Sequence, residues 1–534
     1  MNGAQVVVKT LLEEGVDTVF GYPGGSALPL YDALYEARGA LRHVLTCHEQ
    51  GAAHAADGYA RASGRVGVVV ATSGPGATNL VTGIAAAYMD STPLVALTCN
   101  VPLSFLGRDS FQEIDIAGVT MPITKYGYIV KEPGQLADTL RAAFAIARSG
   151  RPGPVLVDIP RDVAEAADVP DGGRALYTPP RIDISRDAAA RVARALAKAE
   201  RPVVLCGGGV VSGGAGGALL ALAERLDAPV CATLMGLGAV PWNHPLFLGL
   251  AGIHGLPEAN RALAECDLLL AAGTRFTERM AGGRADFAPG ADVYHIDIDA
   301  AEIGKNIAPR DSLIGPAGPA LEAVLARLER GDAKPWAGGF TPFADRPAPA
   351  PDDPRGLIRA LWRHRTPDMT VVADVGQHQM WTAQAYGFDR PRGFLTSGGL
   401  GAMGFGMGAA VGAALARPGT RVALVIGDGG FHMCMAELAT AVALGLPITV
   451  FVLDNGGLGL VRQLQDKEYG GRRYAVEPGW RTDYVGLAEA FGAKGFSLTD
   501  MARGDEIIPA ALATVGPGVV HCLVGGDGDV SIDN

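Results

Sequence analysis

Cysteine is scarce in this sequence, and no two cysteines form a CxxC pair. The chain of 534 residues has 7 of them, an odd number, at positions 47, 99, 206, 231, 266, 434 and 522. A disulfide framework normally uses an even, closely spaced set, so this pattern indicates reduced thiols. The sequence opens in a helical pattern from Gln5 to Gly15 and lacks the regions of a signal peptide. We therefore expect a cytoplasmic protein.

Clustered positive charge and long apolar runs are also missing. Lys and Arg total 45 against 56 Asp and Glu, which gives a formal net charge of −11 and no basic stripe. Proteins that bind nucleic acid need clustered Lys and Arg to contact phosphates, so we expect no nucleic-acid partner. No apolar run reaches the length of a membrane-spanning helix, so we expect no membrane partner.

Glycine, proline and apolar residues are what the sequence has in abundance. Composition is 48% hydrophobic with 74 Gly and 35 Pro, which is typical of an α/β enzyme with many tight loops. The length predicts about three domains. We predict three doubly wound parallel-sheet domains, at residues 1–165, 186–331 and 355–534, with a Pro-rich linker at 332–354 before the third.

The most informative stretch runs from Arg421 to Gly459 and reads as one βαβ unit. Two apolar runs, Val422 to Ile426 and Ile448 to Leu453, predict buried parallel strands around a helical segment. Ligands bind beyond the carboxyl ends of such strands, and here those ends carry Gly427-Asp428-Gly429-Gly430 and Asp454-Asn455-Gly456-Gly457. The glycines allow close approach to a phosphate, and Asp428 and Asn455 supply oxygen ligands suited to Mg²⁺. The alternative is a pair of Gly-rich turns that only end two core strands.

The N-terminal part shows three further strand-to-turn junctions. They deliver the strings Tyr22 to Ser26, His48-Glu49-Gln50 and Ser73 to Gly76, each at the end of a predicted strand. A loop of this kind before a helix offers backbone N–H groups to a ligand. Glu49, taken alone, is equally well a solvated surface carboxylate.

The central part repeats the pattern, with a predicted strand that enters a glycine turn at Pro202 to Gly209 and further predicted strands at Leu268 to Gly273 and Val293 to Asp299. It reads either as a nucleotide-binding domain or as a structural spacer. A plain NAD-binding protein is disfavoured, because Gly207-Gly208-Gly209 lacks a GxGxxG motif with a downstream acidic partner.

Several strings occur together in the order and spacing of one family. They are Gly-Tyr-Pro-Gly-Gly at 21–25, His-Glu-Gln-Gly-Ala-Ala at 48–53, Thr-Ser-Gly-Pro-Gly-Ala-Thr-Asn-Leu at 72–80 and Gly-Asp-Gly at 427–429 with Asn455. The ordered set resembles the large, catalytic subunit of acetolactate synthases (acetohydroxyacid synthases), which depend on thiamine diphosphate (thiamine pyrophosphate, TPP). The resemblance covers essentially the whole chain. It implies a pyrimidine-binding first domain and a diphosphate-binding third domain.

The resemblance also implies residue roles. Glu49 corresponds to the catalytic glutamate that bonds the pyrimidine ring, and Gln112 and Lys125 correspond to residues of the substrate channel. Mg²⁺ ligands are implied at Asp428, Asn455 and the Gly457 carbonyl. Arg279 matches a substrate-carboxylate residue, and Leu464 stands where the family has a tryptophan that lines the acceptor pocket. TPP contacts are implied at Gly24, Gly25, Ser73, Gly74, Gln377, His378, Met403, Gly427, Gly429 and Gly430, with Met403 as the apolar prop beneath the bent cofactor.

The central domain resembles the FAD-binding domain of the biosynthetic members. Implied FAD contacts are Arg151, Gly207, Gly208, Gly209, Thr233, Leu234, Gly252, His254, Gly255, Gly273, Arg275 and Asp297. The sequence departs from the family at Pro316, where an Asp is usual, and at Asn100, where a Gln is usual.

The implied reaction joins pyruvate to a second 2-oxoacid, giving 2-acetolactate or 2-aceto-2-hydroxybutyrate and CO2, as in branched-chain amino acid biosynthesis. Because Glu49 and Asp428 belong to different domains, the family places the cofactor between chains, which implies a homodimer or homotetramer, with a possible small regulatory subunit. Two alternatives stay open: a related TPP-dependent lyase or acyl transferase with another acceptor, and a non-catalytic paralogue. The second would need damage at Glu49, Asp428 or Asn455, and all three are present.

Overall fold

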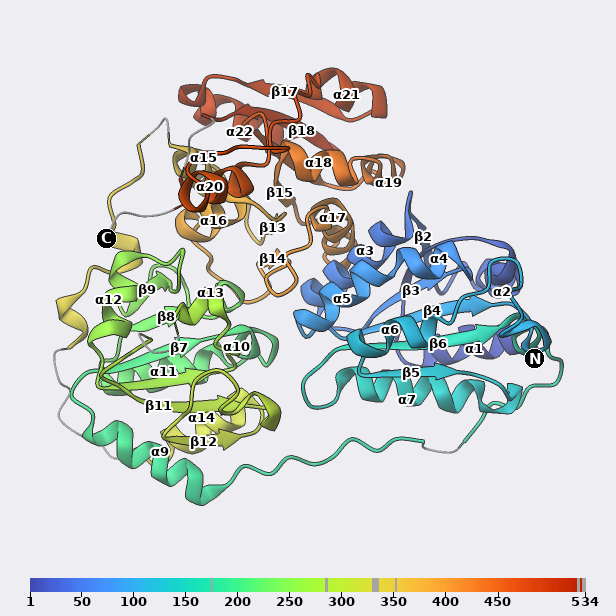
Figure 1. Ribbon diagram of the computed structural model, residues 1–534, viewed down its shortest axis with the longest axis horizontal. Coiled ribbons are helices and arrows are strands. Elements are labelled where there is room, and N and C mark those ends of the chain that lie inside the picture. Colours follow the sequence, from blue (N-terminus) through green and yellow to red (C-terminus); the bar gives the residue numbers. More distant parts are fainter. Residues whose placement is uncertain (174–175, 284–286, 329–335, 351–352, 526–528, 531–534) are drawn as a thin grey trace.

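The computed structural model describes residues 1–173, 176–283, 287–328, 336–350, 353–525 and 529–530. The chain forms three six-stranded sheets, each flanked by helices and each coloured as one continuous part of the sequence in Figure 1. Every strand pair in the three sheets is parallel. The prediction of three doubly wound α/β layers is therefore confirmed.

The first sheet has the strand order β2-β1-β3-β4-β6-β5. Its strands are β1 (Thr18–Tyr22), β2 (Arg42–Leu45), β3 (Gly67–Ala71), β4 (Leu94–Asn100), β5 (Tyr126–Ile129) and β6 (Pro154–Pro160). The helices around it are α1 (Gly3–Glu13), α2 (Leu28–Glu36), α3 (Glu49–Ser63), α4 (Pro75–Asn79), α5 (Val81–Met89), α6 (Ile116–Thr120), α7 (Leu136–Arg148) and α8 (Arg161–Glu165).

The third sheet repeats this order, as β14-β13-β15-β16-β18-β17. Its strands are β13 (Thr370–Ala373), β14 (Phe394–Thr396), β15 (Val422–Gly427), β16 (Ile448–Asp454), β17 (Lys494–Leu498) and β18 (Gly518–Leu523). Its helices are α15 (Pro354–Arg363), α16 (Gln377–Ala385), α17 (Phe405–Ala416), α18 (Asp428–Cys434), α19 (Glu437–Ala443), α20 (Gly459–Glu468), α21 (Tyr484–Phe491) and α22 (Gly504–Leu512).

The central sheet has a different order, β12-β11-β10-β7-β8-β9. Numbered within the sheet, this is the 3-2-1-4-5-6 order of dinucleotide-binding folds. Its strands are β7 (Pro202–Cys206), β8 (Val230–Ala232), β9 (Phe247–Leu250), β10 (Leu268–Ala272), β11 (Asp292–Asp297) and β12 (Asp311–Ile314). Its helices are α9 (Arg186–Lys198), α10 (Gly208–Ser212), α11 (Gly216–Leu226), α12 (Pro257–Glu265), α13 (Glu278–Ala281) and α14 (Ala317–Leu325).

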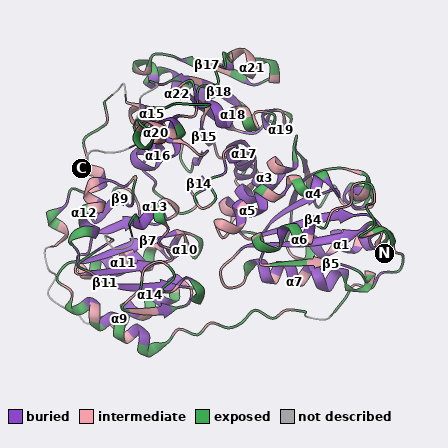
Figure 2. Ribbon diagram, viewed as in Figure 1, coloured by how far each residue is buried: buried purple, intermediate pink, exposed green. Residues whose placement is uncertain are grey.

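The strands form where the sequence has short runs of Val, Leu, Ile and Ala. All residues of β3 are buried, as are the first five of β15, and Figure 2 shows the strands buried beneath exposed helix faces. Parallel strands covered on both faces are expected to be continuously apolar, because neither face meets water. Within the described residues, no helix is both long enough and apolar enough to cross a bilayer.

The first and third domains dock through α3 and α17, which lie side by side in Figure 1. Small residues make this possible: a Cβ placed on Gly412 would lie 1.9 Å from the Ala55 carbonyl oxygen, and one on Gly58 would lie 2.3 Å from that of Ala409. The two helix backbones therefore touch with no side chain between them.

The predicted linker contains two short 3-10 turns, Ala337–Gly339 and Phe343–Asp345. Phe343 is buried against Trp242 and Phe247 of the central domain, so this segment packs on that domain. Residues 332–335 and 351–352 of the predicted linker and 531–534 at the predicted end of the third domain lie outside the described residues. The domain boundaries themselves stay predictions.

Candidate cofactor site

The predicted metal ligands come from neighbouring strands of the third sheet. β15 and β16 pair in the register Val422↔Ile448 through Gly427↔Leu453. Asp428 directly follows β15. Asp454 is the last residue of β16, and Asn455 directly follows it. The carboxyl ends of parallel strands share one edge of a sheet, so both predicted ligands emerge at that edge.

Asp428 is an almost fully buried carboxylate, 4% exposed. Burial raises its pKa to about 6, and the nearby negative charge of Asp454 adds to this. Asp454 behaves in the opposite way, because a hydrogen bond from His521 at 2.9 Å lowers its pKa. A divalent cation would favour the charged form of Asp428, which burial now disfavours.

Asn455 is held by both ends of its amide. Its Nδ2 donates to Gln377 Oε1 at 2.9 Å, and its Oδ1 accepts from the Gly457 N–H at 3.3 Å. The amide oxygen therefore faces the turn that carries the Gly457 carbonyl, the third predicted ligand. Gly459 leaves the room for this contact, because a Cβ there would lie 1.9 Å from Gln377 Oε1.

Gln377 and His378 begin α16, just beyond β13. The chain leaves β13 for β14 on one side and returns to β15 on the other, so this is the topological switch point of the sheet, where ligands of α/β proteins bind. His378 is buried, burial lowers its pKa to about 4, and its Nε2 has no hydrogen-bond partner among the described residues. A neutral imidazole nitrogen buried without a partner fits a site that receives a polar ligand.

Glycines make space around these side chains. A Cβ on Gly427 would lie 3.1 Å from His378 Nδ1, and a Cβ on Gly430 would lie 2.8 Å from Asp374 Oδ1. The methyl carbon of Met403 lies 3.5 Å from the place of a Cβ on Gly429. The structure thus brings Met403, the predicted apolar prop, next to the glycine turn predicted to bind diphosphate.

The first sheet has its own switch point, between β1 and β3. The hydroxyls of Ser26 and Ser73 are hydrogen-bonded there at 2.9 Å. Gln112 lies over Gly74, whose Cβ would be 2.9 Å from the Gln112 Cα. Both residues have positive φ, +58° at Gly74 and +60° at Gln112, and a left-handed non-glycine residue marks local backbone strain of the kind that clusters at functional sites.

Glu49 is the first residue of α3 and is 9% exposed, so it is not a solvated surface group. Asn79 Nδ2 donates to its Oε2 at 2.9 Å. Gly76 keeps the other oxygen accessible, because a Cβ there would lie 3.2 Å from Glu49 Oε1. Asn79 lies within the string at 72–80, but sequence alone does not show which side chain meets Glu49.

Glu437 of α19 is a second residue that sequence reasoning missed. Its Oε1 accepts from the N–H groups of Cys47 and His48, both at 3.0 Å. It therefore anchors the start of α3, and with it Glu49, to the third domain. In sequence it is one charged residue of a helical segment, and no local pattern distinguishes it.

Three predicted residues are not brought to these clusters within one chain. Lys125 Nζ donates to the carbonyls of Ile146 and Ser149 at the end of α7, and burial lowers its pKa to about 8. The Arg279 side chain is 58% exposed, and its nearest carboxylate is Glu278 at 3.9 Å. Leu464 is half-buried in α20.

The predicted FAD residues follow the carboxyl ends of five adjacent strands of the central sheet. Gly207 to Gly209 follow β7, Thr233 and Leu234 follow β8, Gly252 to Gly255 follow β9, Gly273 and Arg275 follow β10, and Asp297 ends β11. β7 and β10 are the strands at the switch point, and a Cβ on Gly209 would lie 2.7 Å from the Gly273 Cα. Because these residues are glycines, backbone atoms rather than side chains line this edge of the sheet.

Two arginines at that edge differ in their partners. Arg151 donates to Glu302 Oε1 and Ser91 Oγ, both at 2.8 Å. The Arg275 guanidinium has no hydrogen bond or ion pair among the described residues, and burial and the charge of Arg151 lower its pKa. A largely buried, unpaired guanidinium fits a site for an anionic group.

The described residues contain no group of three or more His, Cys, Asp or Glu side chains placed to hold a metal ion. The described part of the chain therefore lacks the side-chain cluster that a zinc site uses. The predicted Mg²⁺ ligands, one carboxylate, one amide oxygen and one backbone carbonyl, are the oxygen-rich kind that Mg²⁺ prefers.

Comparison with known proteins agrees with this geometry along the chain. Family models match the "Thiamine pyrophosphate enzyme, N-terminal TPP binding domain" at residues 1–119, the "central domain" at 189–324 and the "C-terminal TPP binding domain" at 374–522. The acetolactate synthase large subunit of Parasynechococcus marenigrum is 44% identical over 547 residues, covering 98% of this chain and 88% of that protein.

Two bacterial relatives give the same result. The acetolactate synthase large subunit of Lactococcus lactis is 43% identical over 516 residues, or 93% of this chain and 88% of its own. The acetolactate synthase isozyme 3 large subunit of Escherichia coli is 42% identical over 533 residues, or 96% and 93%. These matches and the three domains establish that the chain belongs to the acetolactate synthase large-subunit family of TPP enzymes.

Proposed function

We propose that this protein condenses pyruvate with a second 2-oxoacid, releasing CO2 and forming 2-acetolactate from two pyruvates. The observation that carries this is the carboxyl edge of the third sheet, where Asp428 follows β15, Asn455 follows β16 and bonds Gln377, and His378 follows β13 with a nitrogen that has no partner among the described residues. When bound, TPP supplies the nucleophilic carbon that adds to the pyruvate carbonyl.

Glu49 is the residue we propose to control protonation of the cofactor ring. Asn79 occupies its Oε2, which leaves Oε1 to hold a proton toward the pyrimidine nitrogen. Burial excludes competing water from this carboxyl group, and Glu437 fixes the helix start that carries it. A proton held at one defined atom is the requirement for general acid–base catalysis.

Asp428 Oδ, Asn455 Oδ1 and the Gly457 carbonyl are proposed to hold Mg²⁺ against the diphosphate. Their support is the shared edge of β15 and β16 and the orientation of the Asn455 amide. Gly24, Gly25, Ser73 and Gly74 are proposed to contact the other end of TPP from the first domain.

Substrate contacts are proposed for Arg279, Gln112, Lys125 and Leu464. The exposed Arg279 guanidinium can meet a 2-oxoacid carboxylate, and Gln112 lies beside the Gly74 turn. Leu464, where the family has tryptophan, leaves more room for the acceptor. We therefore propose pyruvate as acceptor, with 2-oxobutyrate as a second acceptor giving 2-aceto-2-hydroxybutyrate.

FAD is proposed as a second bound group, in the central domain. The support is the 3-2-1-4-5-6 strand order together with the unpaired Arg275 at the switch-point edge. Purified protein should be yellow with a flavin absorbance band, and Arg275→Met should lose that band while the central domain stays folded. A colourless and fully active preparation would contradict the proposal that FAD binds.

We further propose a cytoplasmic homodimer or homotetramer with a possible small regulatory subunit, acting in branched-chain amino acid biosynthesis. The support for a dimer is that the hydrogen bond of the Glu49 side chain stays within the first domain of its own chain, while the diphosphate residues belong to the third. Sedimentation of the purified chain with TPP and Mg²⁺ tests this.

The central experiment incubates the purified chain with TPP, Mg²⁺ and pyruvate and measures acetolactate after acid conversion to acetoin. Product that depends on both TPP and Mg²⁺ is the expected result. No product with pyruvate, or with pyruvate and 2-oxobutyrate together, would favour the alternative of a related lyase or acyl transferase.

One departure from the family supports that alternative. Asn100, which departs from the family, donates from Nδ2 to the buried Asp158 at 2.7 Å and sits at the base of the segment that leads to Gln112. If the segment is placed differently for this reason, another acceptor would be used. Pyruvate consumption without acetolactate, followed by screening of aldehydes and other 2-oxoacids as acceptors, would identify it.

A further inference from the structure

Asp374 is a fully buried carboxylate outside the set of proposed cofactor residues. It directly follows β13, at the carboxyl edge of the third sheet, and precedes Gln377 and His378 at the start of α16. Burying a charged group without partners is unfavourable, so the partners of this carboxylate indicate its role.

The partners of Asp374 are backbone N–H groups. Its Oδ1 accepts from the N–H of Val375 at 2.7 Å and from that of Gly404 at 3.1 Å. Its Oδ2 accepts from the N–H of Gly406 at 2.7 Å. The Gly404 N–H belongs to the peptide bond between Met403 and Gly404. The carboxylate therefore holds the peptide group that directly follows the predicted apolar prop.

An ionised carboxyl group suits this set of donors better than a neutral side chain of the same shape. A carboxylate has two acceptor oxygens and no donor, whereas an amide replaces one of these oxygens by an NH2 donor. Burial raises the pKa of Asp374 to about 6, and the backbone hydrogen bonds act in the opposite direction, so the group is mostly charged at neutral pH. Gly406 lies in the first turn of α17, where the helix dipole favours a negative charge.

Glycines make room for this carboxylate in two helices. A Cβ on Gly406 of α17 would lie 3.0 Å from Asp374 Oδ2, and a Cβ on Gly430 of α18 would lie 2.8 Å from Asp374 Oδ1. Gly404 has a φ of +85°, which glycine adopts without strain. Because α17 also packs on α18, Asp374 lies between the segment that carries Met403 and the predicted diphosphate turn.

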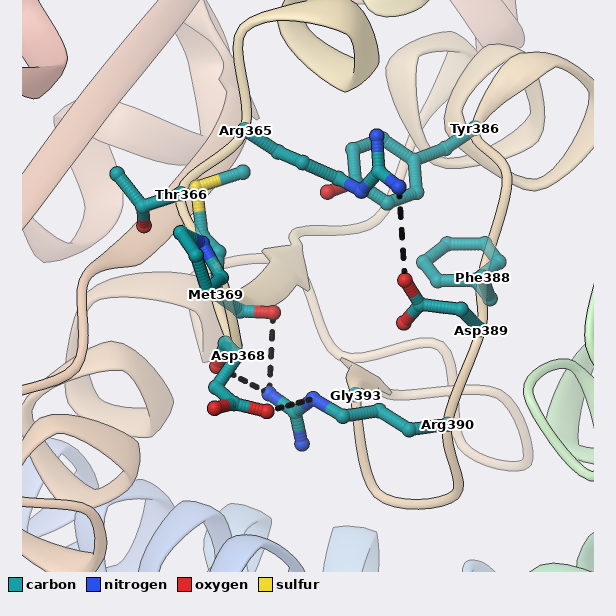
Figure 3. Close-up of a pocket in the computed structure, with 10 residues that line it drawn as sticks. Arg365, Thr366, Asp368, Met369, Tyr386, Phe388, Asp389, Arg390 and Gly393 are labelled. Atoms are coloured by element: carbon teal, nitrogen blue, oxygen red, sulfur yellow. Dashed lines mark hydrogen bonds and ion pairs between the residues drawn. The ribbon is translucent and has the colours of Figure 1, made fainter.

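The backbone that carries Asp374 is itself held at both ends of β13. At the carboxyl end, the Asp374 N–H donates to the Val425 carbonyl at 3.0 Å. At the amino end, Arg390 donates to the Met369 carbonyl at 3.0 Å and to Thr370 Oγ1 at 3.1 Å. Figure 3 shows Arg390 against Met369 beside the pocket at this end of the strand. Since β13 is buried and pairs with β14 and β15, the carboxylate has a fixed base.

The segment before Met403 is held as well. The Ala402 N–H donates to Ser397 Oγ at 3.1 Å, and Gln379 of α16 donates from Nε2 to Thr396 Oγ1 at 2.7 Å. The Met403 side chain is only half-buried. Its position therefore depends strongly on the backbone on either side of it, which Ser397 holds before Met403 and Asp374 holds after it.

We propose that Asp374 is a positioning residue for the Met403 side chain. By holding the peptide between Met403 and Gly404, its carboxylate sets where Met403 lies beside the Gly429 turn, and so where the bent cofactor is supported. This inference rests on the proposed TPP site and assigns to Asp374 a role that acts through Met403.

The first test measures Asp374→Asn in the full chain without TPP. In either orientation of the amide, its NH2 group faces the Gly404 or the Gly406 N–H, so at least one hydrogen bond is lost. Amide hydrogen exchange at residues 402–406 should therefore be at least roughly tenfold faster than in wild type. Exchange that stays as slow as in wild type would overturn the proposal.

Asp138→Asn is the matched control. Asp138 is also buried, at 8% exposure, and accepts from the Gly173 N–H at 2.8 Å, but it lies in the first domain. This variant should leave exchange at residues 402–406 and pyruvate consumption as in wild type. Equal effects of the two variants at residues 402–406 would overturn the proposal, because they would report a general cost of losing a buried carboxylate.

The second test separates positioning from cofactor binding. Equilibrium dialysis with Mg²⁺ should give Asp374→Asn a TPP dissociation constant within about threefold of wild type, since Asp428 and Asn455 are unchanged. Pyruvate consumption at saturating TPP should have a kcat about 10- to 100-fold lower, because a small displacement of a positioned group costs that much. Weaker TPP binding with a normal kcat would assign Asp374 to the diphosphate residues and overturn the proposal.

A double-mutant cycle tests whether Asp374 acts through Met403. In the Met403→Ala background, Asp374→Asn should lower kcat by no more than about threefold, because the side chain to be positioned is gone. An equal loss of kcat in both backgrounds would overturn the proposal.

Gly406→Ala is a second variant for the same cycle, and it replaces Asp374→Asn if that chain does not fold. Its Cβ would displace the Asp374 carboxylate without removing it, and alanine is favoured over glycine in a helix. It should lower kcat when Met403 is present and have little effect in Met403→Ala. A normal kcat of Gly406→Ala beside Met403 would contradict the proposal.

Failure of the proposed reaction would give a different result. A wild-type chain that consumes pyruvate without forming acetolactate would change the proposed product, whereas the exchange, dialysis and cycle measurements would still support or contradict the role of Asp374. A wild-type chain that binds no TPP would overturn the proposed cofactor site and this inference together.

Discussion

Glu49 carries the proposed chemistry of the first domain, and its surroundings explain how one carboxyl group can do so. It is buried at the start of α3. Its Oε2 accepts a hydrogen bond from Asn79, and the missing side chain of Gly76 leaves space beside its Oε1. The backbone before it is fixed by Glu437. The position of Glu49 and its hydrogen-bond partner are thus set by two other elements, α19 and α4.

Replacing Glu49 by Gln should lower turnover about 10²- to 10⁴-fold, because an amide cannot exchange the proton. TPP and Mg²⁺ binding, measured by equilibrium dialysis, should change little, since the proposed diphosphate contacts lie in the third domain. Glu265→Gln, at an exposed position of α12, is the matched control. Near-normal acetolactate formation by Glu49→Gln would refute the role of Glu49.

Asp158 gives a prediction on pH and stability. It is 1% exposed, and Thr98 Oγ1 and Asn100 Nδ2 each donate to it at 2.7 Å. Burial raises its pKa to about 6 from 3.8. The folded state therefore binds a proton that the unfolded state has released between these pH values, so this contribution to stability is full below about pH 4 and is lost as pH rises through about 6.

The size of this contribution is about 3 kcal/mol, at roughly 1.4 kcal/mol for each pH unit between the two pKa values. Asp158→Asn removes the titration and keeps the shape. The urea midpoint of wild type minus that of Asp158→Asn should therefore fall between pH 4 and pH 6.5 and stay constant above. A difference that is flat over the whole range would show that Asp158 is not protonated in the fold.

At the scale of elements, the contact of α3 with α17 fixes the first domain to the third. Gly58, Gly408 and Gly412 lie where the two backbones touch. The same helix α3 carries Glu49, and the segment before α17 carries Met403. The packing of small residues therefore sets how the helix that carries Glu49 lies against the third domain of its own chain.

Gly412→Ala should destabilise this contact by about 1–3 kcal/mol, because its Cβ would lie 1.9 Å from the Ala55 carbonyl oxygen and the helices must separate. Gly217→Ala in α11 is the control: nothing lies within 4 Å of its Cβ, and removing a helical glycine should stabilise by about 0.5–1 kcal/mol. Denaturant midpoints measure both. Equal midpoints for the two variants would contradict close packing of α3 on α17.

At the scale of the whole molecule, a few polar side chains join the domains. Arg61 donates to the Thr396 carbonyl at 2.7 Å and pairs with Asp57 and Asp90, and Asp90 accepts from the Gly399 N–H at 2.7 Å. Arg392 contacts the first and central domains at once. These contacts hold the segment 396–399, just before Met403, against the first domain.

Arg392→Met should loosen the arrangement of the three domains without unfolding any of them. Two hydrogen bonds from a charged group are lost, each worth about 1.5–3 kcal/mol. Amide hydrogen exchange should rise in the segments around Arg61 and Ser212. Arg65→Met, which breaks only an exposed pair with Asp17, is the control, and equal exchange in the two variants would show that Arg392 does not link the domains.

Much of the fold could be predicted from sequence, because the signals are local. The apolar runs of β15 and β16 and the glycine turns after them are contiguous in the chain. The roles of Asn79, Glu437 and Arg392 could not be predicted. Each depends on a partner in another element, 30, 389 or 331 positions away, and no periodicity reports such a contact.

The sequence by itself determined the three α/β layers and the polar residues that end their strands, since alternating strands and helices of this composition bury their apolar faces in few ways. The tertiary structure alone decided which side chains meet. It turned the Lys125 amine onto the end of α7 and placed a His378 nitrogen without a hydrogen-bond partner among the described residues at a switch point. The physical reason is that strand order and helix docking, not spacing along the chain, set the distances between side chains.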